Sequence, residues 1–310
     1  MIVPQETLRH DHEHVIHAPV SRMATAFFLT TTILVVEVAG GLMAHSLALL
    51  SDAGHVLTDI VAIGLAWFAL RQAEKPADAN MTFGYYRSGV LAALVNGVSL
   101  ILIMLWILWE AYGRLHNPPP VQGKWMFAAA GVGMMVNLYL GLTMHKEDNI
   151  NVKSAVLHML GDAAASAGVI VGGLVILWTG WYVVDPILSV LIALLIAFGA
   201  WRIIRQTIII LMEGVPLGID FQNVIKEIVS IDGIFNVHDL HIWSITGGKN
   251  ALSCHVVCTG DMTVQQSQSV LQDIEHRLLH LNIHHVTVQV ENDEYCHSDS
   301  PFCSNRGRRW

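Results

Sequence analysis

Two histidine–aspartate pairs with identical spacing stand in separate, strongly apolar parts of the sequence. The first pair is His55 and Asp59, and the second is His158 and Asp162. Residues four apart lie on one face of an α-helix, about 6 Å apart along its axis. Two imidazoles and two carboxylates are enough ligands for a tetrahedral site that holds a divalent metal. Because ionisable side chains in membrane spans commonly line a bundle interior or an ion path, these four residues form a candidate metal site.

A buried His–Asp hydrogen-bonded pair between helices and a proton relay are alternatives that the same residues allow. The charge balance favours a metal, because a dication between two carboxylates and two neutral imidazoles makes a neutral core. Without an ion the carboxylates would repel each other and take up protons. Metal binding would then displace protons and couple the two movements in opposite directions. The ligand types suit Zn²⁺ better than Mg²⁺ or Ca²⁺, and they also allow Cd²⁺, Co²⁺ or Ni²⁺.

An intramembrane zinc hydrolase is the enzyme that such residues could form. It would need an open coordination position and a general base, as in the pattern His-Glu-x-x-His. Val56 and Met159 follow the two histidines, so the general base of that pattern is missing. No enzymatic activity is predicted.

Asp52 lies on the same helix face as His55, whereas Ala155 occupies the matching place before the second pair. Asp52 could receive the ion on its way in, or it could orient an imidazole from behind. The structural alternative is a cap at the start of the helix. Asp185, which precedes a proline, is interpreted as the cap and first turn of its own helix.

The composition indicates a membrane protein. The chain has 310 residues, of which 53% are hydrophobic and 14% are charged, whereas soluble proteins have about 25% charged residues. A net charge of −8 argues against a nucleic-acid partner. The first twenty residues are polar and rich in histidine, so no cleavable signal peptide is expected.

Six stretches are long and apolar enough to span a bilayer, which takes about 20 residues. They are Met23–Met43, Leu47–Leu70, Tyr85–Leu115, Trp125–Met144, Val152–Trp178 and Val183–Met212. Basic residues gather before the first span, around the loops after the second and fourth, and late in the sixth. The positive-inside rule therefore predicts cytosolic N- and C-termini.

A soluble module follows the last span. Helices are expected over Ile219–Ile231 and Val264–Leu281, and strands over Ile234–Ile245, Ala251–Cys258 and His285–Glu291. The order αββαβ suggests a small cytosolic sheet that serves for dimerisation. The expected parts are a histidine-containing tail (1–20), a six-helix membrane domain (21–212), a metal-binding and dimerisation domain (213–291) and a cysteine-containing tail (292–310).

Several motifs resemble the cation diffusion facilitator family. They are the stretch from Ser46 to His55 with Asp59, the run from Thr82 to Arg87, Leu157-His158 with Asp162, and the run from Val237 to Trp243. The resemblance, closest to the zinc-transporting branch, implies homodimeric proton antiporters with six spans and a ferredoxin-like cytosolic domain. It implies that the two His–Asp pairs are the transport site and that Zn²⁺ is exported. Export of Cd²⁺, Co²⁺, Ni²⁺ or Fe²⁺, or zinc sensing without transport, are the alternatives.

The resemblance also implies metal ligands in the cytosolic module. His238 and His255 on neighbouring strands and Glu291 at the end of the third match cytosolic ligands of zinc-transporting relatives. A second, sulfur-bearing site could combine His284, which alternation places on the other face from Glu291, with Cys296 and Cys303.

Three further expectations concern the cytosolic side of the protein. Arg87 and Glu213 match a Lys–Asp pair that links protomers in relatives. They are predicted to form a charge-assisted lock at the hinge before the soluble module. The alternative is that both are ordinary solvated charges. The loop 71–80 has no histidine, so no further metal site is expected there. The N-terminal histidines (His10, His12, His14 and His17) either collect ions or form a solvated tail.

Overall fold

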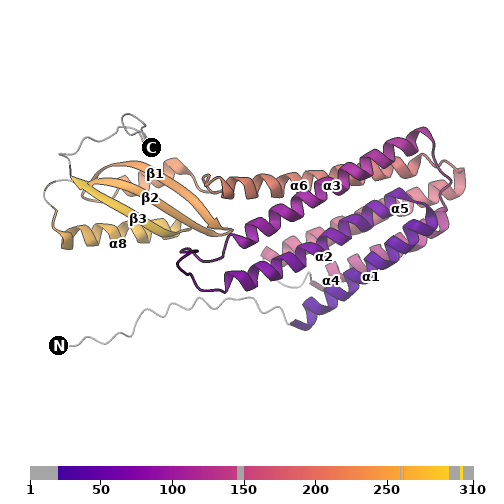
Figure 1. Cartoon of the computed structure of the whole chain (residues 1–310), viewed down its shortest axis with the longest axis horizontal. Coiled ribbons are helices and arrows are strands. Elements are labelled where there is room, and N and C mark those ends of the chain that lie inside the picture. Colours follow the sequence, from indigo (N-terminus) through magenta and orange to yellow (C-terminus); the bar gives the residue numbers. More distant parts are fainter. Residues whose placement is uncertain (1–19, 145–149, 259, 261, 293–300, 303–310) are drawn as a thin grey trace. The chain divides into compact units, whose positions relative to one another are not determined.

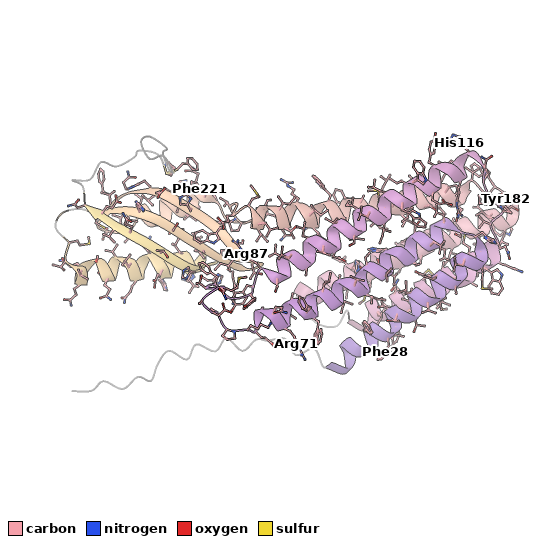
Figure 2. All side chains as sticks on the ribbon, in the orientation of Figure 1. Phe28, Arg71, Arg87, His116, Tyr182 and Phe221 are labelled. Carbon is pink, nitrogen blue, oxygen red and sulfur yellow. The ribbon has the colours of Figure 1, made fainter. Side chains whose placement is uncertain are left out.

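The computed structural model describes residues 20–144, 150–258, 260, 262–292 and 301–302 (Figure 1). Six of its helices are long and apolar enough to cross a membrane. They are α1 (Val20–Ala44), α2 (Leu47–Ala73), α3 (Ser88–His116), α4 (Gly123–Met144), α5 (Ile150–Thr179) and α6 (Val184–Leu211). Large apolar side chains on them are exposed, such as Phe28 at 70% (Figure 2). Apolar side chains that face outward from long helices are typical of a multi-pass membrane protein, as predicted.

The third helix begins later than the sequence predicted. It starts at Ser88 and not at Tyr85, because the preceding residues form a turn around Asp78. The Asp78 carboxylate accepts hydrogen bonds from the backbone N–H groups of Asn80 and Met81 and from the Tyr85 hydroxyl. These bonds hold Tyr85 in the turn and out of the helix.

The start of α2 is held by a residue from the start of α6. Asp185 accepts hydrogen bonds from the Ser46 hydroxyl and from the backbone N–H groups of Leu47 and Ala48, at 2.5, 2.8 and 3.2 Å. The first N–H groups of a helix lack partners within the helix, so a carboxylate there satisfies them. Asp185 lies in the first turn of α6, but it caps α2; the prediction that it caps its own helix was wrong.

The chain divides into two compact units. The first contains residues Met1–Ile60 and Ile103–Leu194, and the second contains Val61–Leu102 and Leu195–Trp310. Within the first unit, α1 packs on α4 and α4 packs on α5. Both His–Asp pairs belong to this unit, so their geometry can be described within it.

The second unit includes a small sheet with two helices. In chain order its elements are α7 (Phe221–Val229), β1 (Ile234–Thr246), β2 (Lys249–Cys258), α8 (Val264–His280) and β3 (Ile283–Asn292). The sheet order is β1-β2-β3, with β1 antiparallel and β3 parallel to β2. The predicted order αββαβ is confirmed.

An apolar core joins the helices of this module to the sheet. Ile228 of α7, Ile274 and Leu278 of α8 and Leu252 of β2 are almost completely buried in it. Thr263 begins α8 with a capping box, since its hydroxyl accepts from the backbone N–H of Gln266 while the Gln266 side chain accepts from the backbone N–H of Thr263. Because α7 contacts β1, α8 contacts β3 and the two helices contact each other, both helices cover the same face of the sheet.

Candidate metal sites

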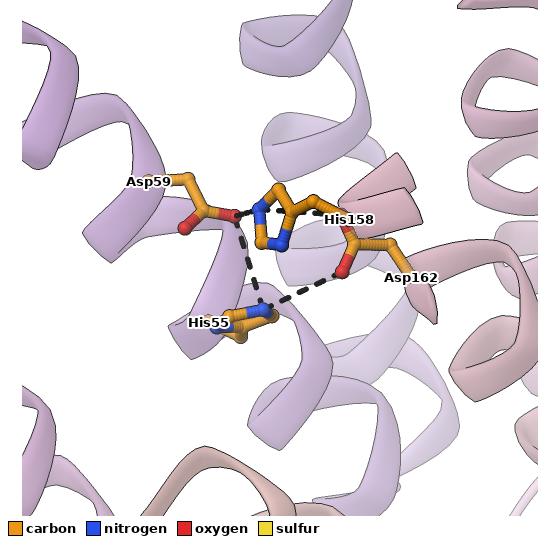
Figure 3. Close-up of side chains that lie close together, drawn as sticks. All are labelled: His55, Asp59, His158 and Asp162. Atoms are coloured by element: carbon orange, nitrogen blue, oxygen red, sulfur yellow. Dashed lines mark hydrogen bonds and ion pairs between the residues drawn. The ribbon is translucent and has the colours of Figure 1, made fainter. Parts of the chain in front are cut away.

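The two His–Asp pairs face each other across α2 and α5. Figure 3 shows His55 and Asp59 on one helix directed toward His158 and Asp162 on the other. His55 Nε2 lies 3.5 Å from Asp162 Oδ1 and 3.9 Å from Asp59 Oδ2. His158 Nε2 lies 3.3 Å from Asp59 Oδ2 and 3.7 Å from Asp162 Oδ2. Each imidazole therefore contacts a carboxylate of its own helix and one of the other helix.

These separations fit a tetrahedral zinc site. One ligand atom from each of the four residues lies within 4.8 Å of all the others. Zinc bonds of about 2.0–2.2 Å to nitrogen and oxygen place neighbouring ligands about 3.4 Å apart in a tetrahedron. The contacts of 3.3–3.9 Å are close to this value, so small side-chain movements would suffice. The side chains are 16–52% exposed, which leaves the ligand atoms accessible to an ion.

A second group of possible ligands lies at the sheet of the cytosolic module. His238 Nε2 of β1 lies 3.3 Å from Glu291 Oε2 of β3, and His255 Nδ1 of β2 lies 2.9 Å from Glu291 Oε1. His238 and His255 are direct partners across the β1–β2 pair. Ligand atoms of all three residues again lie within 4.8 Å of one another. The structure thus brings together the three residues for which the sequence predicted a cytosolic site.

Comparison with known proteins identifies the family. The family model of the cation efflux transmembrane domain matches residues 23–212, and that of the cation efflux protein cytoplasmic domain matches residues 216–293. The chain belongs to the cation efflux family. This is a family of transporters, and the resemblance to cation diffusion facilitators is confirmed.

Named relatives of this cation efflux protein cover nearly its whole length. The cadmium, cobalt and zinc/H⁺-K⁺ antiporter of Bacillus subtilis is 40% identical over 296 residues, which is 94% of this chain and 95% of that protein. The metal cation efflux system protein CzcD of Cupriavidus metallidurans is 41% identical over 91% of this chain and 89% of its own. The zinc transporter ZitB of Escherichia coli is 38% identical over 96% of both chains.

Asp52 precedes His55 by one helical turn, but no hydrogen bond joins it to the four candidate ligands in the described part of the chain. It is 3% exposed, and its Oδ2 accepts a hydrogen bond from the Ser166 hydroxyl of α5 at 3.3 Å. Because α2 begins at Leu47 and is capped by Asp185, the alternative of a helix-start cap was wrong. Among the described residues the buried His55 Nδ1 has no hydrogen-bond partner, so Asp52 does not orient this imidazole by a direct bond.

Asp239 is a neighbour of the candidate ligand group on the sheet that the sequence analysis missed. Its Oδ2 lies 3.5 Å from His255 Nε2, and its Oδ1 lies 3.3 Å from His241 Nε2. Strict alternation would place Asp239 on the face opposite His238. The β1–β2 register shifts between His238 and His241, and Asp239 has a φ of 50°. This irregularity turns its carboxylate toward His255.

Arg87 and Glu213 meet in the second unit. Arg87 Nη2 donates to Glu213 Oε1 at 3.2 Å, with the side chains 41% and 64% exposed; Arg87 is labelled in Figure 2. The two charges come from the segments just before α3 and just after α6. They pair within one chain here, whereas the matching pair of relatives was expected to link protomers.

The predicted sulfur-bearing site cannot be assembled from the described residues. His284 is exposed on β3, and Cys296 and Cys303 lie outside the described part of the chain, as do the histidines of the N-terminal tail. Cys254 and Cys258 are described and are free thiols in the module's core. Burial raises the pKa of Cys254 to about 12 and also raises that of Cys258. Because a thiolate is the metal-binding form, these two cysteines are structural.

Proposed function

We propose that this cation efflux protein exports Zn²⁺ from the cytoplasm in exchange for protons. The observation that carries the proposal is the close approach of two imidazoles and two carboxylates between α2 and α5. In this proposal His55, Asp59, His158 and Asp162 are the transport site. A bound dication would balance the two aspartates, and ligation through the Nε2 lone pairs would displace any proton held there.

The named relatives support this choice of substrate. One is called a zinc transporter, and another a cadmium, cobalt and zinc/H⁺-K⁺ antiporter. A mixed nitrogen and oxygen ligand set is compatible with zinc and also with cadmium and cobalt. Zinc is therefore the proposed main cargo, with Cd²⁺ and Co²⁺ as alternatives.

The proposal includes the topology of the protein in the membrane and its association into a homodimer. The protein spans a bacterial inner membrane, and both of its termini lie in the cytosol. Residues 21–212 form the membrane domain, and residues 213–291 form the domain through which two copies associate. Zinc bound by His238, His255 and Glu291 would neutralise part of the local charge and favour association of the two copies. Support comes from the family match of the cytoplasmic domain and from the ligand geometry on its sheet.

A vesicle experiment tests the proposed function. Vesicles that contain the reconstituted protein and an enclosed zinc dye are used. They are expected to accumulate zinc when the imposed proton gradient drives protons out of the vesicle as zinc enters. Collapsing the gradient with a protonophore is expected to slow accumulation, and repeating the assay with Cd²⁺ and Co²⁺ ranks the cargoes. Zinc binding without any gradient-driven flux would overturn antiport and favour a membrane-bound zinc sensor.

Charge reversal tests the lock proposed for Arg87 and Glu213. The substitution Arg87→Glu replaces the cationic partner of Glu213 by a second negative charge, so transport or dimer stability is expected to fall. The double variant with Glu213→Arg restores opposite charges and is expected to recover much of the loss. An exposed pair contributes about 0–1 kcal/mol, so the expected change in the thermal midpoint is a few degrees at most. A double variant no better than the single one would show that the two residues do not act as a pair.

A further inference from the structure

Glu37 of α1 is a completely buried carboxyl group that the four-ligand site does not use. Its exposed fraction is 0%, and neither carboxyl oxygen has a hydrogen-bond partner among the described residues. It packs against Gly133 of α4, where an added Cβ would lie 2.5 Å from Glu37 Oε1. The glycine therefore provides the space in which this carboxyl group sits.

Two further oxygen-bearing side chains lie at the same place. The Ser166 hydroxyl of α5 lies 3.5 Å from the Cβ position of Gly133, and it donates its hydrogen bond to Asp52 of α2. Ser166 and Asp52 are 1% and 3% exposed. Side chains of α1 and α5 thus meet at one glycine of α4, and Ser166 connects this place to Asp52 of α2, all within the first compact unit.

The described residues give the Glu37 carboxyl group neither a hydrogen-bond donor nor a positive counter-charge. Ser166 supplies one hydroxyl proton, which is used by Asp52, so the described residues offer no donor to Glu37. Among the described residues, the charged groups near enough to act on Glu37 are Asp52 and Asp162, which are both acidic. An ionised carboxylate that is buried without a donor or a counter-charge is very costly, and such a group neutralises instead. A proton on Glu37 removes its charge, so that its oxygens no longer need a counter-charge.

We propose that Glu37 is a proton-binding site distinct from the metal site and that it carries one of the protons exchanged for zinc. The proposal rests on the proposed function of proton antiport. Asp52 stands three residues nearer the Leu47 end of α2 than His55, so the cluster flanks the metal site toward the face where α2 begins. With the proposed topology that face is the outer one, from which the exchanged protons enter. The cluster contains oxygen ligands only, which suits a proton better than zinc.

The variant Glu37→Gln keeps the size of the side chain and removes the exchangeable proton. In reconstituted vesicles it is expected to bind zinc with the stoichiometry and affinity of the wild type at the four-ligand site. The steady-state ratio of the zinc concentration inside the vesicle to that outside is expected to fall by about tenfold for each unit of imposed pH difference. The reason is that each transport cycle then exchanges one proton fewer. The infrared C=O stretching band of a protonated carboxyl should be present in the wild type and missing in Glu37→Gln.

Glu110→Gln is the matched control, since Glu110 is a half-exposed acid of α3 whose carboxylate pairs with Arg114. Its response to the gradient is expected to match the wild type. An unchanged zinc ratio in Glu37→Gln, with a wild type that does respond, would overturn this inference alone. A wild type that ignores the gradient would overturn the antiport proposal itself. Zinc accumulation by Glu37→Gln could also keep its response to the proton gradient and lose its response to a K⁺ gradient. The site would then bind K⁺, and the assignment of a proton would be wrong.

Discussion

Replacing Asp162 by alanine is expected to abolish zinc transport while leaving a folded protein. The substitution removes one of four ligands and one of the two negative charges that balance the ion. Loss of even an outer partner of a metal ligand weakens binding by about 10–100-fold, so loss of a direct ligand should exceed about 100-fold. Equilibrium zinc binding and dye-monitored flux in vesicles measure the two effects on the same preparation.

The matched control is Leu157→Ala on the same helix. Leu157 is 70% exposed and lies directly before His158, so its loss changes α5 without removing a ligand. Its zinc affinity and flux are expected to stay near those of the wild type. If Asp162→Ala, eluting and unfolding like the wild type, transported zinc at a comparable rate, the assignment of the four-residue site would be wrong.

Zinc is expected to stabilise the cytosolic sheet through His238, His255 and Glu291, and His255→Ala should remove this effect. A ligand that binds only the folded form raises the free energy of unfolding by about 2.7 kcal/mol at a concentration 100 times its dissociation constant. Amide hydrogen exchange in β1, β2 and β3 of the full-length protein, with and without zinc, measures it. The protection should slow exchange by about 100-fold in the wild type.

The same stabilisation should depend on pH with a defined sign. Zinc binds neutral imidazole, so protons compete with it and the added protection should be lost as the pH falls. His280→Ala removes an exposed histidine of α8 that lies outside the ligand group, and it should leave the zinc effect intact. Equal zinc protection in His255→Ala and His280→Ala would exclude the proposed cytosolic site.

Local periodicity explains what could be predicted from the sequence. A helix repeats every 3.6 residues, so a spacing of four places a histidine and an aspartate on one face without any knowledge of the fold. Long apolar runs predict spans because a bilayer leaves backbone groups no partner except those within a helix. The alternation of strands likewise predicted the β1–β2 pair that sets His238 beside His255.

Contacts between distant segments were decided by the tertiary structure alone. Asp185 caps α2 because the start of α6 lies beside it, and the local sequence of either helix contains no sign of this. The shifted register of β1 directs Asp239 to His255 against simple alternation. Glu37 can be buried completely because a glycine of α4 leaves room for its carboxyl group. Spacing along one element determines which side chains share a face, whereas only the packing of elements determines what that face meets.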